Sequence, residues 1–221
     1  ESEYVLYSND FSSSDLSDFK MLITSGKANV SNGKLYMDGA IKALLPAYLA
    51  DFYNYTITSN ATIISSPKST KWFSFMYRYQ NANLYYHFIA KVGTTASNGI
   101  IHQLRESSSA WSYQAQTSYS EALNASKSYL FKLEAYGNTA GGYINNKKLL
   151  RTHEINALSK GKLGLQVNGT KVAFDDIKIS IDFNKIYDYM TVNKYQALDK
   201  ASNGLLVNGM ADFSILASTK G

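Results

Sequence analysis

Short segments of alternating apolar and polar residues follow one another along most of the chain, and turn-forming residues interrupt them about every 8–12 residues. Residues 72–79 carry aromatic side chains at nearly every second position, and residues 84–92 return after a polar turn signal. Asn32-Gly33 is a dipeptide typical of a two-residue hairpin turn. No segment shows the pattern of a long helix. We therefore predict about a dozen antiparallel strands in an all-β sandwich or jelly roll.

The alternation is one-sided, as a sheet with one buried face requires. In residues 129–136, Phe131, Leu133 and Ala135 share one face, whereas Lys132 and Glu134 share the other. Residues 72–78 behave in the same way, with Phe73, Phe75 and Tyr77 opposite Trp72, Ser74, Met76 and Arg78. Two such sheets packed face to face would bury both apolar faces.

The composition bounds the environment of the protein. The 221 residues include 18 tyrosines and 10 phenylalanines but no cysteine, which excludes disulfides and thiolate-bound metal sites. Serine, threonine and asparagine are plentiful, as on the polar faces and turns of strands. This composition fits an exported bacterial protein better than a cytosolic one, so we predict a secreted or cell-surface location.

The formal net charge is +5 and the sequence pI is about 9.1. The basic residues are scattered, however, and only Lys147 and Lys148 are adjacent. Nucleic-acid surfaces cluster their cations, so we interpret these residues as solvated edge and turn positions and predict no nucleic-acid partner. No apolar run approaches the roughly 20 residues that a membrane helix needs, and we predict no membrane span.

No catalytic motif is present. The three histidines, His87, His102 and His153, have no metal-ligand spacing, and the central strands hold no acidic residue between Asp51 and Glu106. Nucleophile-elbow, phosphate-loop and dinucleotide-binding patterns are also absent. The simplest interpretation of His87 and His102, without any ligand, is that they are polar residues on a solvated sheet face. We assign no catalytic residue.

Four segments carry a resemblance to a known family. Residues 161–179, Gly-Lys-Leu-Gly-Leu-Gln-Val-Asn-Gly-Thr-Lys-Val-Ala-Phe-Asp-Asp-Ile-Lys-Ile, resemble the closing hairpin of concanavalin A-like lectin/glucanase jelly rolls, in their laminin-G-like, sugar-hydrolase-associated branch. Residues 7–11, 72–88 and 133–149 agree with that family in the same order. The resemblance covers residues 4–182 and implies two antiparallel sheets, one of them concave.

The domain boundaries follow from this coverage. We expect residues 1–182 to form the jelly-roll sandwich. Residues 183–221 differ in pattern, with one or two helical turns expected within residues 187–201 and a short strand at 205–207. This C-terminal extension either packs on the sandwich or begins a further domain.

The resemblance also implies a sugar-related function, since the concave sheet is the usual ligand surface of this fold. Aromatic rings would stack on a pyranose and cations would donate hydrogen bonds; the alternative is that these aromatics fill the core. The candidate carbohydrate-binding residues are Trp72, Arg78, Tyr85, His87, His102, Arg105 and Trp111.

We therefore predict a non-catalytic carbohydrate-binding or accessory module of an exported bacterial hydrolase. The resemblance implies that such domains accompany glycoside hydrolases, polysaccharide lyases or glycerophosphodiester phosphodiesterases. A glycan or cell-surface polysaccharide and a catalytic domain of the full-length protein are therefore the expected partners. A glycoside hydrolase in its own right is one alternative, although the Glu-x-Asp-x-x-Glu strand of the glucanases is missing. A structural or adhesion domain without a small ligand is the other.

The resemblance further implies a structural calcium ion on the convex side, where the opening and closing strands meet. Calcium takes hard oxygen ligands, and the candidates are Asn9, Asp10, Asp175 and Asp176. Adjacent residues of a strand face opposite ways, so only one of Asp175 and Asp176 can face outward, and the alternation leaves open which. The alternative is that these side chains bind backbone amides without any ion.

Overall fold

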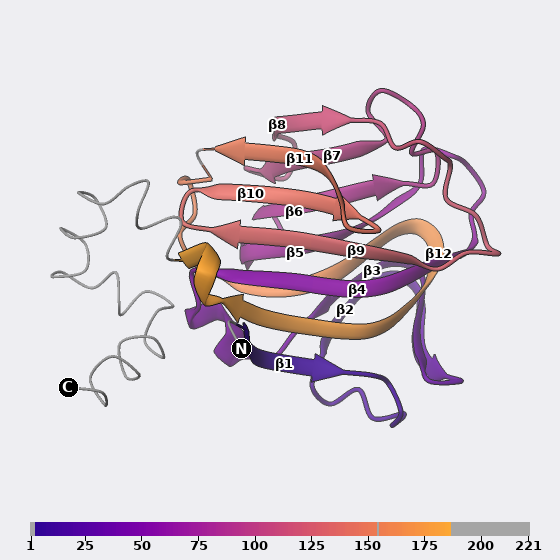
Figure 1. Ribbon diagram of the computed structural model, residues 1–221. Coiled ribbons are helices and arrows are strands. Elements are labelled where there is room, and N and C mark those ends of the chain that lie inside the picture. The colour runs from indigo at the N-terminus through magenta and orange to yellow at the C-terminus, as the bar shows by residue number, and fades with distance from the viewer. Residues whose placement is uncertain (1–2, 154, 187–221) are drawn as a thin grey trace, which may run out of the picture.

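The computed structural model describes residues 3–153 and 155–186, which contain twelve strands in one hydrogen-bonded sheet (Figure 1). The strands are β1 (Glu3–Asn9), β2 (Lys20–Ser31), β3 (Lys34–Leu44), β4 (Tyr55–Ser65), β5 (Trp72–Asn81), β6 (Leu84–Lys91), β7 (Ile100–Arg105), β8 (Trp111–Thr117), β9 (Tyr129–Tyr136), β10 (Thr139–Ile144), β11 (Lys147–His153) and β12 (Lys162–Asp182), with the 3-10 helix η1 (Ala47–Asp51) between β3 and β4. In this part of the chain, no helix has the length and apolarity required to span a membrane. The features predicted for residues 187–221 lie outside the described residues.

The sheet folds over into two layers that lie face to face (Figure 1). One layer has the order β11-β10-β9-β4-β12, and the other has the order β12-β5-β6-β7-β8. β12 belongs to both because residues 162–168 pair with β5, whereas residues 171–180 pair with β4. The predicted all-β, two-sheet antiparallel jelly-roll sandwich is confirmed.

Glycines allow the long strands to bend from one layer into the other. Gly39 in β3 has a φ of 127°, and a Cβ atom there would lie 2.3 Å from the carbonyl oxygen of Ser25. Its partner across β12 is Thr170, next to Gly169, which has a φ of 72°. Both residues therefore occupy backbone conformations that glycine adopts at least cost.

Two sequence expectations are corrected at this corner. Residues Lys162–Asp182 are one continuous bent strand rather than the two strands of a closing hairpin, because the irregularity at Asn168–Thr170 is a bulge and not a reversal. Similarly, residues 20–31 and 34–44 are strands of 12 and 11 residues, longer than the short segments expected from the sequence. The hairpin between them turns at Asn32-Gly33 as predicted, with both residues at positive φ.

The core lies between the two layers. The Phe73 ring packs edge-on against Phe131 at 4.7 Å and against Phe174 at 5.7 Å, which joins β5, β9 and β12. All three rings are almost completely buried, and burying such a side chain stabilises the fold by roughly 1.5–3 kcal/mol. The opposite face of β5 and its neighbours carries a second, smaller buried cluster that includes Leu44, Met76 and Tyr85.

Candidate functional site

The outer face of the β12-β5-β6-β7-β8 layer contains two adjoining hollows. The first has a volume of about 160 Å³ and is lined by residues of β2, β3, β5, β7, β8 and β12, including Lys42, Arg105 and Gln166. The second has a volume of about 310 Å³ and includes Lys91 of β6. Trp72 and Trp111 line both, so the two indoles mark the centre of this open face.

His87 lies beneath the two tryptophans and is completely buried. Its ring meets Trp72 edge-on and stacks on Trp111, with a centroid separation of 5.5 Å in each case. Tyr85 contacts the same imidazole edge-on at 5.1 Å. Trp111 is still 36% exposed, so an accessible indole rests on a buried support.

A hydrogen-bond network fixes the floor of the face. His87 Nδ1 lies 3.3 Å from Ser74 Oγ, and the Ser74 hydroxyl donates to Gln166 Oε1 at 3.5 Å. The Tyr85 hydroxyl donates to the same oxygen at 3.3 Å. Two hydrogen bonds thus end on Gln166 Oε1, and the tautomer of His87 sets which atom donates in its contact with Ser74. Within the described residues, Nε2 has no hydrogen-bond partner.

The electrostatics keep this imidazole neutral. Burial lowers the pKa of His87 well below its usual value, and the nearby His102, Arg105 and Lys42 lower it further, against a small opposing effect of Gln166. Burial also lowers the pKa of Lys42, and Arg105 adds to that effect by charge repulsion. The open face is thus positively charged, with a neutral histidine below it.

The cations lie against aromatic rings. The Arg105 guanidinium is 4.6 Å from the centre of a Trp111 ring, and Lys42 Nζ is 6.0 Å from the centre of the Tyr85 ring. Such contacts hold long side chains in place. Among the described residues, no aspartate or glutamate lines either hollow.

Arg78 lies elsewhere, although alternation placed it beside Trp72. Its φ of 50° marks a bulge that ends the regular pairing of β5 with β6, and the side chain turns into the protein with 0% exposure. The guanidinium donates to four backbone carbonyls, those of Ile155 at 2.5 Å, Leu158 at 2.9 Å, Gly137 at 2.7 Å and Tyr53 at 3.3 Å. Arg78 therefore ties loops together and does not line the open face.

His102 also lies away from the open face. It packs against the rings of Tyr77 and Tyr86 on the core side, with centroids 5.7 Å away in each case, and hydrogen-bonds the Tyr77 hydroxyl. In the β6–β7 register His87 pairs with Gln103, so the neighbouring His102 must face the opposite way. Burial, with a contribution from the Arg78 charge, lowers its pKa to about 3.

The structure thus brings together five of the seven candidates: Trp72, Tyr85, His87, Arg105 and Trp111. The sequence interpretation missed Lys42, Lys91 and Gln166. Alternation does place Gln166 opposite the buried Leu165 and Val167, and Lys42 opposite Ile41 and Ala43. What it could not reveal is that β12 pairs with β5 along one edge and with β3 along the other, which brings all three strands into one layer.

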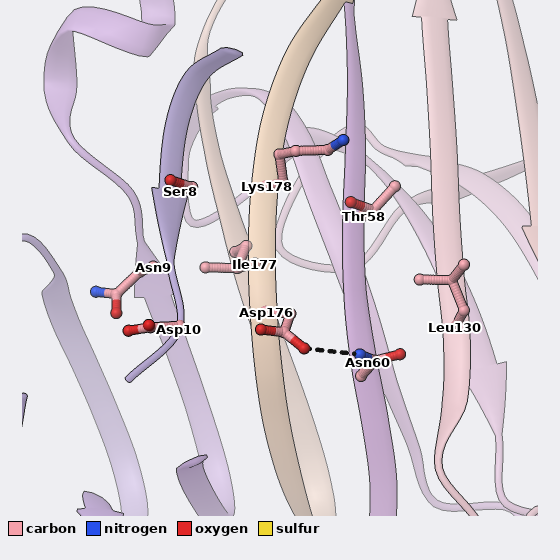
Figure 2. Close-up of a pocket in the computed structure, with 9 residues that line it drawn as sticks. All are labelled: Ser8, Asn9, Asp10, Thr58, Asn60, Leu130, Asp176, Ile177 and Lys178. Carbon is pink, nitrogen blue, oxygen red and sulfur yellow. Dashed lines mark hydrogen bonds between the residues drawn. The ribbon is translucent and has the colours of Figure 1, made fainter. Parts of the chain in front are cut away.

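A third hollow, which is polar and has a volume of about 640 Å³, lies on the outer face of the other layer (Figure 2). It is built by β1, β12, β4 and β9. Figure 2 shows Asn9 and Asp10 on one side of it, and Asp176 hydrogen-bonded to Asn60 on the other. Opening and closing strands therefore do meet here.

Three of the four metal candidates line this hollow, namely Asn9, Asp10 and Asp176. Asp175 does not line it: one of its carboxylate oxygens lies 3.3 Å from Lys34 Nζ, and the other accepts the Asp176 amide proton at 2.9 Å. The φ of 49° at Asp176 belongs to the bulge between Asp175 and Lys178 that separates the two side chains.

Carboxylate and amide oxygens are the donor types that calcium takes, but part of this set is already engaged. Asn9 Oδ1 accepts the Phe11 amide proton at 2.8 Å, and Asp10 Oδ1 accepts that of Ser12 at 3.0 Å. The Ser12 backbone contact lowers the pKa of Asp10. The described residues contain no cluster of three or more His, Cys, Asp or Glu side chains able to hold a metal.

Comparison with known proteins identifies a family that matches the chain and solved structures that share its fold. Residues 7–180 match the model of the 3-keto-alpha-glucoside-1,2-lyase-like domain family. No curated protein matches the chain.

Solved structures with this fold include the CBM66 carbohydrate-binding module from Bacillus subtilis, with 19% identity, a TM-score of 0.57 and coverage of 72% of this chain and 94% of that one. A galectin-like protein of unknown function from the same organism has 16% identity, a TM-score of 0.60 and coverage of 80% and 96%. The catalytic domain of a laminarinase from Thermotoga petrophila has 11% identity, a TM-score of 0.57 and coverage of 81% and 98%. At these identities the likeness concerns the fold.

Proposed function

Because the chain belongs to the 3-keto-alpha-glucoside-1,2-lyase-like domain family, we propose that its open face binds a saccharide in the service of a carbohydrate-active enzyme. One observation carries this proposal: Trp72 and Trp111 jointly line two adjoining hollows over a fixed polar floor. An indole offers a flat apolar surface to the C–H face of a sugar ring. Convergent polar groups beside an apolar surface are typical of a ligand site.

The rigidity of the face supports the same proposal. His87 is held by Ser74 and supports Trp111, so the indole needs little ordering when a ligand arrives. Binding to a preorganised surface avoids part of the entropy cost of association. Lys42 and Arg105, which line the first hollow beside the tryptophans, supply hydrogen-bond donors for the oxygens of hydroxyl groups.

The role that we propose is binding rather than catalysis. Glycoside hydrolysis usually needs two carboxyl groups flanking the bond, and the lining of the two hollows contains none within the described residues. We accordingly propose an accessory domain whose partner is a catalytic domain, such as a glycoside hydrolase, polysaccharide lyase or glycerophosphodiester phosphodiesterase. A bacterial, secreted or cell-surface protein is the setting proposed for it, with residues 1–182 as the sandwich and residues 183–221 as its extension.

The family supplies the competing candidate. Its description names a lyase acting on 3-keto-alpha-glucosides, so this chain could act on such a sugar itself. The two functions separate cleanly in one assay. Incubation of the purified chain with a 3-keto-glucoside and with chromogenic glycosides should give no turnover if the domain only binds, whereas turnover would establish the enzyme.

The experiment for binding compares matched aromatic variants on a glycan array and by calorimetry. Trp72→Ala and Trp111→Ala should each weaken binding of the best glycan at least tenfold. Tyr4→Ala is the control, because Tyr4 is 50% exposed on β1 in the other layer. A chain that binds no glycan, or one whose affinity is indifferent to both tryptophans, would contradict the proposal.

A further inference from the structure

The charges on the open face are all of one sign. Lys42 and Arg105 line the first hollow and Lys91 lines the second. They come from β3, β7 and β6, so the sheet gathers cations that are far apart in the sequence. Within the described residues, the lining of the two hollows contributes no carboxylate to balance them.

These cations also lack ion pairs, which sets them apart from other half-buried cations of the domain. On the opposite layer Lys132 lies 3.4 Å from Glu134, and at the sandwich edge Lys34 lies 3.3 Å from Asp175. No ion pair found in the described part of the chain includes Lys42, Lys91 or Arg105.

The hydrogen bonds of Arg105 do not provide a counter-charge. It donates to the carbonyls of Ser107 at 3.1 Å and Ser108 at 3.3 Å, which are neutral acceptors. Burial lowers the pKa of both Lys42 and Lys91, and repulsion from Arg105 contributes for Lys42. An anion bound here would relieve that repulsion and replace the water that burial removes.

The cations stand where the substituents of a stacked sugar would lie. The Arg105 guanidinium lies 4.6 Å from the centre of one ring of the Trp111 indole, and Lys91 is the direct cross-strand partner of Trp72. Lys42 and Arg105 flank Tyr85, since Lys42 lies over its ring and Arg105 is its partner in the β6–β7 register. A ring resting on either indole therefore has a cation beside it.

We propose that the saccharide recognised by this face is anionic, carrying carboxylate or sulfate groups that Lys42, Lys91 and Arg105 bind while Trp72 and Trp111 stack on the sugar rings. This inference rests on the proposed function and specifies the ligand class. Planar guanidinium suits the two oxygens of a carboxylate or sulfate, and an ammonium acts as a compact point charge beside it.

The test uses pairs of probes that share one sugar backbone and differ in whether it carries anionic groups. Oligogalacturonides are compared with their methyl-esterified forms, and dextran sulfate is compared with dextran, by calorimetry with the full chain. We expect the anionic member of at least one pair to bind at least tenfold more tightly, and the pair that responds distinguishes carboxylate from sulfate. Raising the salt concentration should reduce that advantage.

Charge-matched variants locate the effect. Arg105→Gln and Lys42→Gln should each lower the affinity for the anionic probe about threefold to tenfold. Lys147→Gln removes the same charge from an exposed position of β11 in the other layer and should leave the affinity unchanged. Equal losses in all three variants would mean non-specific attraction to a basic protein and would overturn the inference.

The remaining outcomes separate this inference from the proposed function. If neutral and anionic probes bind equally and Trp72→Ala abolishes both, the face binds sugars but the anionic inference is wrong. If no probe binds and the wider glycan array is also negative, both fail. Anionic selectivity that depends on Arg105 and Trp72 together supports both.

Discussion

The imidazole of His87 stacks on the indole of Trp111, with ring centroids 5.5 Å apart and an angle of 25° between the planes. His87 is in turn anchored to Ser74 in the neighbouring strand β5. The exposed tryptophan on β8 is therefore positioned by a buried histidine on β6. This relationship makes His87 a positioning residue of the proposed site, and it can be tested.

His87→Ala should damage both stability and binding. Removing a completely buried ring leaves a cavity, and a cost of about 2–4 kcal/mol in the free energy of unfolding is expected by urea denaturation. Glycan affinity of the folded variant should fall to the level of Trp111→Ala. His87→Phe keeps a ring under Trp111 and should retain most of the affinity, whereas a purely structural role would leave the affinities of both folded variants unchanged.

Acid should destabilise the protein in a pH window set by its buried histidines. The folded state keeps His102 neutral down to a pKa of about 3, whereas the unfolded chain binds its proton below the ordinary value of 6.5. The unfolded state then holds more protons, so stability falls as the pH drops from about 6.5 towards 3, by up to about 1.4 kcal/mol per pH unit for each such histidine. His87 contributes in the same direction.

Urea unfolding measured at pH 6.5 and pH 5 isolates this effect, since carboxylates protonate mostly at lower pH. His102→Gln can still hydrogen-bond Tyr77 and should show a shallower loss of stability over that interval. The quantity compared is the change in the free energy of unfolding between pH 6.5 and pH 5, and not the stability of the variant at neutral pH. An identical slope in the wild type and the variant would falsify the assignment.

Arg78→Met should unfold the domain more easily without a specific effect on sugar binding. The variant leaves four carbonyls without their donor in a buried setting, and a loss of about 3–5 kcal/mol is expected. Arg151→Met, at an exposed position of β11, is the matched control and should change stability by less than about 0.5 kcal/mol. Equal effects in chemical denaturation would show that the carbonyl contacts contribute little.

Alternation predicted which residues form strands and which side of a strand is buried, as Phe131 and Leu133 illustrate. It failed where the backbone leaves the regular pleat. The bulge at Arg78 turns that side chain inward, and a bulge at Gly169 continues a strand where a hairpin was expected. Register also lay beyond the sequence, because only the pairing of His87 with Gln103 shows that His102 faces the core.

The sequence likewise predicted only part of the candidate calcium site. Periodicity could not choose between Asp175 and Asp176, whereas the structure places Asp176 in the polar hollow with Asn9 and Asp10, and pairs Asp175 with Lys34 (Figure 2). That difference between adjacent residues provides a matched pair of variants. The calcium ion predicted from the sequence can therefore be tested at this hollow, with backbone hydrogen bonding alone as the alternative.

Calcium that binds only the folded state stabilises it by mass action, by about 2.7 kcal/mol at a hundredfold excess over Kd, which raises Tm by about 5–10 °C. Millimolar calcium should therefore raise Tm, and a chelator should return it to the metal-free value. Asp176→Asn should abolish the shift, because it removes a carboxylate from the hollow, whereas Asp175→Asn should keep it. The prediction fails if calcium and chelator leave Tm unchanged, or if Asp175→Asn removes the shift and Asp176→Asn does not.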